Sequence, residues 1–157
     1  MRPIYLQMAD FNSDILHCLQ ELKEGRAVCI HTEAGWVLAS DARKPTPFPK
    51  GSGRPVLLLA EPPDLFTYLS APPLNIQDEL QSFTMPTAIT VSGVLGVDDS
   101  WLNDNLSIAV TLARDEFSFH LVKRFRHPLV LMAVADWNGF KATRYNEPLA
   151  TGFQFIG

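Results

Sequence analysis

Residues Gly25–Ala42 read GRAVCIHTEAGWVLASDA, and this stretch decides the fold. Apolar runs at 27–30 and 36–39 predict two short buried strands. The polar segment between the runs predicts a compact turn, in which Thr32 and Glu33 place a hydroxyl and a carboxylate beside a strand end. Open α/β sheets commonly bind ligands at strand ends, so Thr32 and Glu33 are candidate ligand contacts.

Composition indicates an ordinary globular protein. The chain has 157 residues, of which 46% are hydrophobic and 19% are charged. This balance and length suit one domain. We expect a single domain over residues 1–157, with its core at about 13–139 and the C-terminal tail docked on it. The formal net charge of -4 gives no global attraction to nucleic acid, so RNA binding would need a local basic patch.

Cysteine content and hydropathy argue against several classes of protein. Cys18 and Cys29 both fall in apolar segments, which favours two buried thiols over a disulfide. No Cys/His spacing fits a zinc site, and no apolar run approaches the roughly 18 residues of a membrane span. The first residues do not follow the pattern of a signal peptide. We therefore expect a soluble cytoplasmic protein with no membrane segment and no bound metal.

Helix and strand patterns alternate along the rest of the chain, which predicts an α/β protein. A helix is expected from Asn12 or Ser13 to about Glu24, preceded by a short edge strand or docking arm at Ile4–Leu6. The remaining segments predict strands at Val56–Ala60, Ile89–Val97, Ser107–Leu112, Val130–Val134 and Phe140–Tyr145, and helices at Pro62–Ser70, Asn75–Phe83 and Asp115–Arg126.

The segment Arg43–Pro55 is rich in proline and in positive charge. Its prolines exclude a helix, and Gly51–Gly53 add backbone freedom. Two interpretations stay open. The segment is either a solvated loop or an anion-binding lid over the end of the sheet, in which Lys50 and Arg54 face a phosphate.

A second group of cations, Lys123, Arg124 and Arg126, lies near the end of a predicted helix. Cations at a helix C-terminus suit the helix dipole, so this group has a structural explanation. The alternative is a basic patch that contacts RNA.

The opening stretch resembles the start of YrdC-like proteins, the threonylcarbamoyl-AMP synthase family. In that family a helix, a glycine and a strand precede a P-T-(D/E)-T-x-Y-G-L motif that runs on to D-A. Here the corresponding residues read HTEAGWVL, with Asp41-Ala42 after them. The residues that match the family are Thr32, Glu33, Leu38, Asp41 and Ala42.

Two later segments resemble the same family. Pro86–Thr90 keeps the first proline and the threonine of a P-G-P-x-T motif, the latter as Thr90. Val134–Gly139 corresponds to S-A-N-x-S-G and keeps the alanine and the glycine. In this segment Asp136 replaces the asparagine and Asn138 replaces the second serine.

The cations of the family are changed in this chain. Arg54–Leu57 resembles a K-P-L segment, and Lys50 is the nearest stand-in for the lysine of a K-x-R motif that the family carries on a preceding helix. Thr111 occupies the position of an arginine that the family has partway along a strand. Arg114 comes three positions later, so we do not assign it that role.

The resemblance implies a twisted, open, mixed sheet with helices packed on it and a ligand site on a concave face. No catalytic residue is assigned. The candidate ligand contacts are Thr32, Glu33, Lys50, Arg54, Thr90, Asp136 and Asn138.

The family makes threonylcarbamoyl-AMP from L-threonine, bicarbonate and ATP for tRNA modification, so the resemblance implies ATP or AMP as a ligand. Our first hypothesis is a YrdC-like domain that binds a nucleotide, a small anion or RNA without the full catalytic set. One alternative is an active synthase in which Lys50 and Arg54 grip the phosphates. Another is an interaction or assembly protein whose pocket is closed by Trp36 and Trp137. The sequence does not set an oligomeric state.

Overall fold

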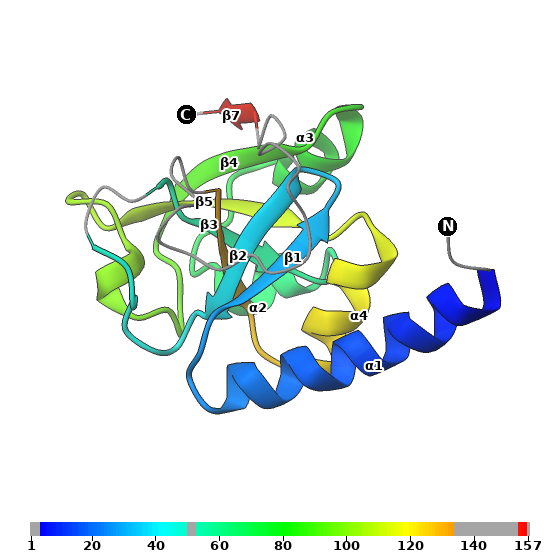
Figure 1. Ribbon diagram of the computed structural model, residues 1–157. Coiled ribbons are helices and arrows are strands. Elements are labelled where there is room, and N and C mark those ends of the chain that lie inside the picture. The colour runs from blue at the N-terminus through cyan, green and yellow to red at the C-terminus, as the bar shows by residue number, and fades with distance from the viewer. Residues whose placement is uncertain (1–3, 50–52, 134–153, 157) are drawn as a thin grey trace.

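The computed structural model describes residues 4–49, 53–133 and 154–156, which form a sheet with helices on both faces (Figure 1). The strands are β1 (Val28–Thr32), β2 (Gly35–Asp41), β3 (Val56–Leu59), β4 (Thr87–Ser92), β5 (Ser107–Leu112), β6 (Leu129–Met132) and β7 (Gln154–Ile156). The helices are α1 (Ile4–Lys23), α2 (Asp64–Tyr68), α3 (Ile76–Ser82) and α4 (Glu116–Phe125), with a 3-10 turn η1 at Asp99–Trp101.

The described strands form one open, mixed sheet of seven strands in the order β1-β2-β6-β3-β5-β4-β7. β3 pairs with β5 in parallel, and β4 pairs with β7 in parallel. The other neighbours are antiparallel. This is the α/β architecture that the sequence predicts, and the described end of the chain, β7, is the strand that pairs with β4.

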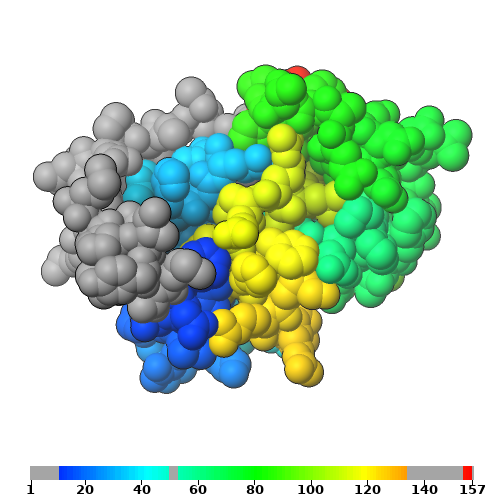
Figure 2. All heavy atoms as spheres, turned by 90° about the vertical axis from the view of Figure 1, so that its right-hand side faces the viewer, coloured from blue at the N-terminus to red at the C-terminus, as the bar shows by residue number. Residues whose placement is uncertain are grey.

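Two hydrophobic layers hold the sheet, because successive side chains of a strand point to opposite faces. α1 and α4 pack side by side on one face, where Leu22 and Leu58 belong to the same buried cluster. We call this the α1–α4 face. α2 and α3 cover the opposite face, where Leu65 packs in one cluster with Leu57. Viewed from the side, α4 lies between α1 and the segment that contains α2 and α3 (Figure 2).

Some predicted boundaries are wrong. α1 begins at Ile4 instead of Asn12, so the short strand expected near its start is helical. No proline or glycine interrupts the sequence from Ile4 to Lys23, so nothing there ends a helix. β4 ends at Ser92, before the predicted end at Val97, because Gly93 turns the chain with a φ of 74°. The predicted strand at 140–145 lies outside the described residues.

Both cysteines are free thiols; Cys18 is buried as predicted, whereas Cys29 in β1 is only partly buried. Burial raises the pKa of Cys18 and that of Cys29 to about 11. The described residues contain no group of three or more His, Cys, Asp or Glu side chains placed to hold a metal ion. None of the described helices combines the length and the apolar character that a membrane crossing requires.

Candidate functional site

The β1–β2 hairpin carries the first predicted contacts. Thr32 pairs with Gly35, which leaves a two-residue turn of Glu33 and Ala34. The hydroxyl of Thr32 accepts a hydrogen bond from the Ala34 N–H (3.1 Å). It also donates one to the Gly35 carbonyl (3.0 Å). Thr32 is buried, so its hydroxyl serves to close the turn.

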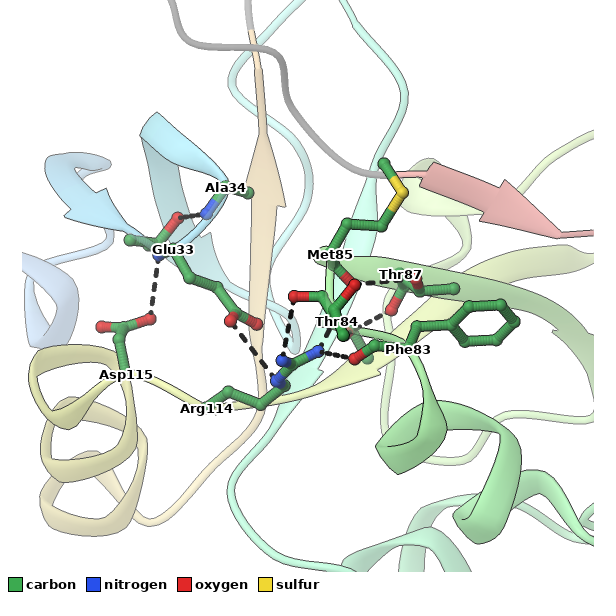
Figure 3. Close-up of polar contacts among 10 residues, drawn as sticks. Glu33, Ala34, Phe83, Thr84, Met85, Thr87, Arg114 and Asp115 are labelled. Carbon is green, nitrogen blue, oxygen red and sulfur yellow. Dashed lines mark hydrogen bonds and ion pairs between the residues drawn. The ribbon is translucent and has the colours of Figure 1, made fainter.

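Arg114, two residues after the end of β5, ties this turn to the segment that precedes β4 (Figure 3). Its Nε lies 3.4 Å from a carboxylate oxygen of Glu33. Its Nη1 donates to the carbonyl oxygens of Phe83 (2.8 Å) and Met85 (3.3 Å). Its Nη2 donates to the carbonyl oxygen of Thr84 (3.4 Å). We call this group, formed by Arg114, Glu33 and residues 83–85, the Arg114 cluster.

Asp115 adds a second link between the hairpin and α4. Its Oδ1 accepts a hydrogen bond from the backbone N–H of Glu33 (3.2 Å), and its Oδ2 accepts one from the N–H of Ser118 (2.9 Å). The second bond is an N-cap, which confirms the predicted start of this helix. One carboxylate therefore orders the helix start and fixes the turn of the hairpin over the carboxyl end of β5.

The Glu33 carboxylate sits in a partly desolvated position. Its side chain is 24% exposed and that of Arg114 is 32% exposed. Burial is the main cause that raises the pKa of Glu33 above its ordinary value, and the charge of Asp115 raises it further. The Arg114 guanidinium acts in the opposite direction. The effect of burial on the pKa of Glu33 is thus larger than that of the ion pair, so folding disfavours the ionised form of this carboxyl group.

Arg54 and Thr90, two of the candidate ligand contacts named from the sequence, lie together on the α1–α4 face. Arg54 Nη2 donates to the Thr90 hydroxyl (3.2 Å). Thr90 is on this face because it pairs with Ala109, which is part of the cluster under α1 and α4. The Arg54 guanidinium also lies 4.0 Å above the ring of Phe155 in β7. An exposed cation–π contact of this kind contributes roughly 0.5–1 kcal/mol, which helps to fix the guanidinium.

Gly53 determines where the Arg54 segment lies. A Cβ at this position would stand 2.6 Å from the carbonyl oxygen of Ala133, immediately after β6. Only glycine permits so close an approach of the two backbones. The segment that leads into β3 is therefore held against the end of β6.

Comparison with known proteins gives a result at the level of structure. No family model matches the sequence, and no curated protein matches it. E. coli YciO superposes with a TM-score of 0.62 and 12% identity, over 90% of this chain and 75% of its own. P. abyssi Sua5 in complex with L-threonine gives a TM-score of 0.61 and 17% identity, over 76% of this chain and 38% of its own. Full-length HypF in its phosphate- and nucleotide-bound form gives a TM-score of 0.61 and 20% identity, over 87% of this chain and 21% of its own.

This chain has a YrdC-like fold. That confirms the resemblance inferred from the three motifs, in spite of the low identities. The chain spans 38% of the Sua5 chain and 21% of the HypF chain, so it corresponds to one part of each. At these identities the likeness shows the fold and leaves the ligand and the activity to be argued from the site.

The YrdC-like fold gives the motif positions a structural meaning. Thr111, at the position of the family's in-strand arginine, is buried, and its hydroxyl donates to the carbonyl oxygen of Thr87 (2.8 Å). This position therefore carries no cation here. Trp36 packs against His31 with ring centroids 4.8 Å apart. It points away from the α1–α4 face, because its neighbour Val37 belongs to the cluster on that face.

Four residues named from the sequence, Lys50, Asp136, Trp137 and Asn138, lie outside the described residues. Among the others, the structure joins Arg54 to Thr90, and it joins Glu33 to Arg114, which the sequence analysis had set aside. One signal points to Arg114. It falls between a strand and a helix-capping aspartate, and this is where the carboxyl end of a strand presents side chains to a site.

Proposed function

We propose that this YrdC-like domain binds a small anion, a nucleotide or free phosphate, on the α1–α4 face, and that it does not transfer a threonylcarbamoyl group. The observation that carries the proposal is the exposed guanidinium of Arg54, held by Thr90 and by the ring of Phe155. A guanidinium has five N–H donors in a rigid fork that matches a phosphate. The bond to Thr90 uses one of them.

The loss of catalysis is argued from groups that the fold now uses for itself. Thr111 replaces a cation with a hydroxyl that is bonded to β4. Every side-chain nitrogen of Arg114 contacts the protein. The Thr32 hydroxyl closes its own turn. Removal of one group that stabilises charge in a transition state costs about 10²–10³ in rate, so several such changes favour binding over reaction.

The structural neighbours suggest which ligands to test first. The HypF structure contains phosphate and nucleotide, and one Sua5 structure contains L-threonine. We infer that AMP, ATP and inorganic phosphate are the first compounds to test on this chain, with L-threonine next. RNA is a weaker candidate, because the net charge is -4 and a basic patch would have to overcome it.

Isothermal titration calorimetry with AMP, ATP, phosphate and a short RNA tests the binding half of this proposal. We expect saturable binding of at least one phosphate compound, weakened about tenfold or more by Arg54→Gln, since a hydrogen bond to a charged group contributes about 1.5–3 kcal/mol. Arg26→Gln is the matched control, because Arg26 is an exposed arginine that pairs with Glu21 and Glu24 beside α1. No binding at millimolar concentration would exclude the proposal.

A coupled assay for pyrophosphate tests the other half. The protein is incubated with ATP, L-threonine and bicarbonate, and we expect no pyrophosphate above the level seen without threonine. Release that depends on both threonine and bicarbonate, and that Arg54→Gln abolishes, would instead show an active threonylcarbamoyl-AMP synthase.

A further inference from the structure

A hollow of about 310 Å³ opens between α2 and α4, at the carboxyl end of β3. Sites for small molecules begin at about this volume, and strand carboxyl ends are common places for them in α/β sheets. Leu59 and Val122 contribute to its apolar lining.

The hollow is separate from the site at Arg54. Arg54 precedes β3 and the hollow lies after it, and β3 spans four residues, so Arg54 and the hollow are roughly 13 Å or more apart. In Figure 2, α4 (yellow to orange) borders the blue-green segment that contains α2.

One wall of the hollow carries positive charge. Lys123 and Arg126 supply this charge, from the last turn of α4 and its C-cap, and His127 lines the same wall. Arg126 has a φ of 69°, a left-handed conformation that glycine usually occupies after a helix and that is unfavourable for a residue with a Cβ. Within the described part of the chain, its guanidinium has no hydrogen-bond or ion-pair partner.

Compensation of the helix dipole does not account for this wall. A cation anywhere near the last turn serves that purpose. Arg124 already lies on this turn, outside the hollow, where it donates to the side-chain oxygen of Asn12 (2.9 Å). The dipole therefore explains the presence of cations at the end of α4. It does not explain why the residue that borders the hollow in a left-handed backbone conformation is an arginine instead of a glycine.

The opposite wall offers oxygen atoms. Asp64 and Tyr68 line it. Burial, followed by the charge of Asp64, raises the pKa of Tyr68, so its hydroxyl stays protonated at neutral pH. One oxygen of Asp64 accepts from the N–H of Glu61 (3.0 Å). The Glu61 carboxylate lies 3.3 Å from Lys123 with both side chains more than 40% exposed, so an incoming anion can replace this weak ion pair at little cost.

We propose that the hollow binds the phosphate monoester of a small polyhydroxylated molecule. Lys123 and Arg126 contact the phosphate, and Asp64 and Tyr68 accept and donate hydrogen bonds to hydroxyl groups. The two walls match the two ends of such a molecule. This site is separate from Arg54, so it stands whether or not the α1–α4 face binds a nucleotide.

Titration of the ¹⁵N-labelled full chain with ribose 5-phosphate, followed by two-dimensional NMR, tests the site. We expect saturable shifts of residues 59–68 and 122–128, whether or not β4, which reports on Arg54, also shifts. Ribose without phosphate should produce no such shifts, and inorganic phosphate should bind more weakly than the ester. Shifts confined to β4 would overturn the proposal. So would the absence of any shift at about 10 mM ribose 5-phosphate, a concentration at which even a weak ligand binds. Equal binding of inorganic phosphate would overturn the assignment of the hydroxyl wall.

Two variants of Arg126 keep the test independent of folding. Arg126→Gly and Arg126→Asn both tolerate a left-handed φ, so we expect each to unfold at no lower urea concentration than the wild type. Both should weaken ribose 5-phosphate by about tenfold or more, because each removes a charged donor to the phosphate. Arg124→Asn, on the same turn but outside the hollow, is the control. Equal weakening by this control would reduce the effect to net charge and refute the site.

Discussion

Replacement of Arg114 by glutamine tests whether the Arg114 cluster holds the β1–β2 hairpin in place. The variant loses one short hydrogen bond to Phe83 (2.8 Å), two longer ones to Met85 and Thr84 (3.3 and 3.4 Å), and the ion pair with Glu33. The short bond contributes about 1.5 kcal/mol and the longer ones about 0.5 kcal/mol in total. The ion pair adds about 0.5–1 kcal/mol, because about a quarter to a third of each side chain is exposed.

These contributions predict that Arg114→Gln lowers the free energy of unfolding by about 2–3 kcal/mol, measured by urea denaturation. A double-mutant cycle with Glu33→Gln should give a coupling of about 0.5–1 kcal/mol. Arg26→Gln, in an exposed ion pair, should change stability by less than about 0.5 kcal/mol. A loss at Arg114 no larger than that of this control would refute the role assigned to the cluster, and so would a coupling of zero to its ion pair.

Three further predictions concern the same elements. Gly53→Ala places a Cβ 2.6 Å from the Ala133 carbonyl, so it should cost about 1–3 kcal/mol in urea denaturation. Asp115→Ala removes an N-cap and the bond to the Glu33 N–H, so it should lower stability by about 1–2 kcal/mol and speed amide exchange at Ser118. Because the pKa of Glu33 is raised on folding, the folded state binds its proton more tightly. The stability that Glu33 contributes is therefore fully present below its ordinary pKa and is lost as the pH rises through its pKa in the folded state. Glu33→Gln should remove this pH dependence from urea denaturation curves measured from about pH 4 to 7, the range in which a carboxyl group of raised pKa titrates.

Local patterns identified most of the elements. β5 has the predicted bounds, Ser107–Leu112, because its apolar residues are flanked by polar turns. α4 starts after Asp115, as its capping residue indicates. Errors arose where the local signal is silent or weak. α1 extends back to Ile4 through residues that include no proline or glycine. Without such a residue or a clear N-cap, the sequence does not indicate where the helix begins.

The site was harder to predict, because its contacts join segments that are distant in the sequence. The N–H of Glu33 reaches Asp115, 82 residues later, only because the hairpin folds over the end of β5. The two apolar runs placed Glu33 in a turn and Thr32 beside it at the strand end, but they could not show that the Thr32 hydroxyl forms its hydrogen bonds within that turn. Arg54 and Thr90 were both named as candidates because each belongs to a segment that resembles a family motif, but their contact depends on the strand order.

The positions of Thr111 and Arg114 explain why neither residue presents a cation to the α1–α4 face. Side chains alternate along a strand, so Thr111 faces the α1–α4 face together with Ala109. An arginine at 111 would present its charge to that face. Arg114 lies beyond the last residue of β5, so its guanidinium reaches sideways to the hairpin and to the carbonyl groups before β4. This arrangement uses the charge of Arg114 to stabilise the fold and places no cation at position 111. It leaves Arg54 as the described arginine that contacts Thr90 on the α1–α4 face, which is why the affinity of Arg54→Gln for phosphate compounds is the decisive measurement.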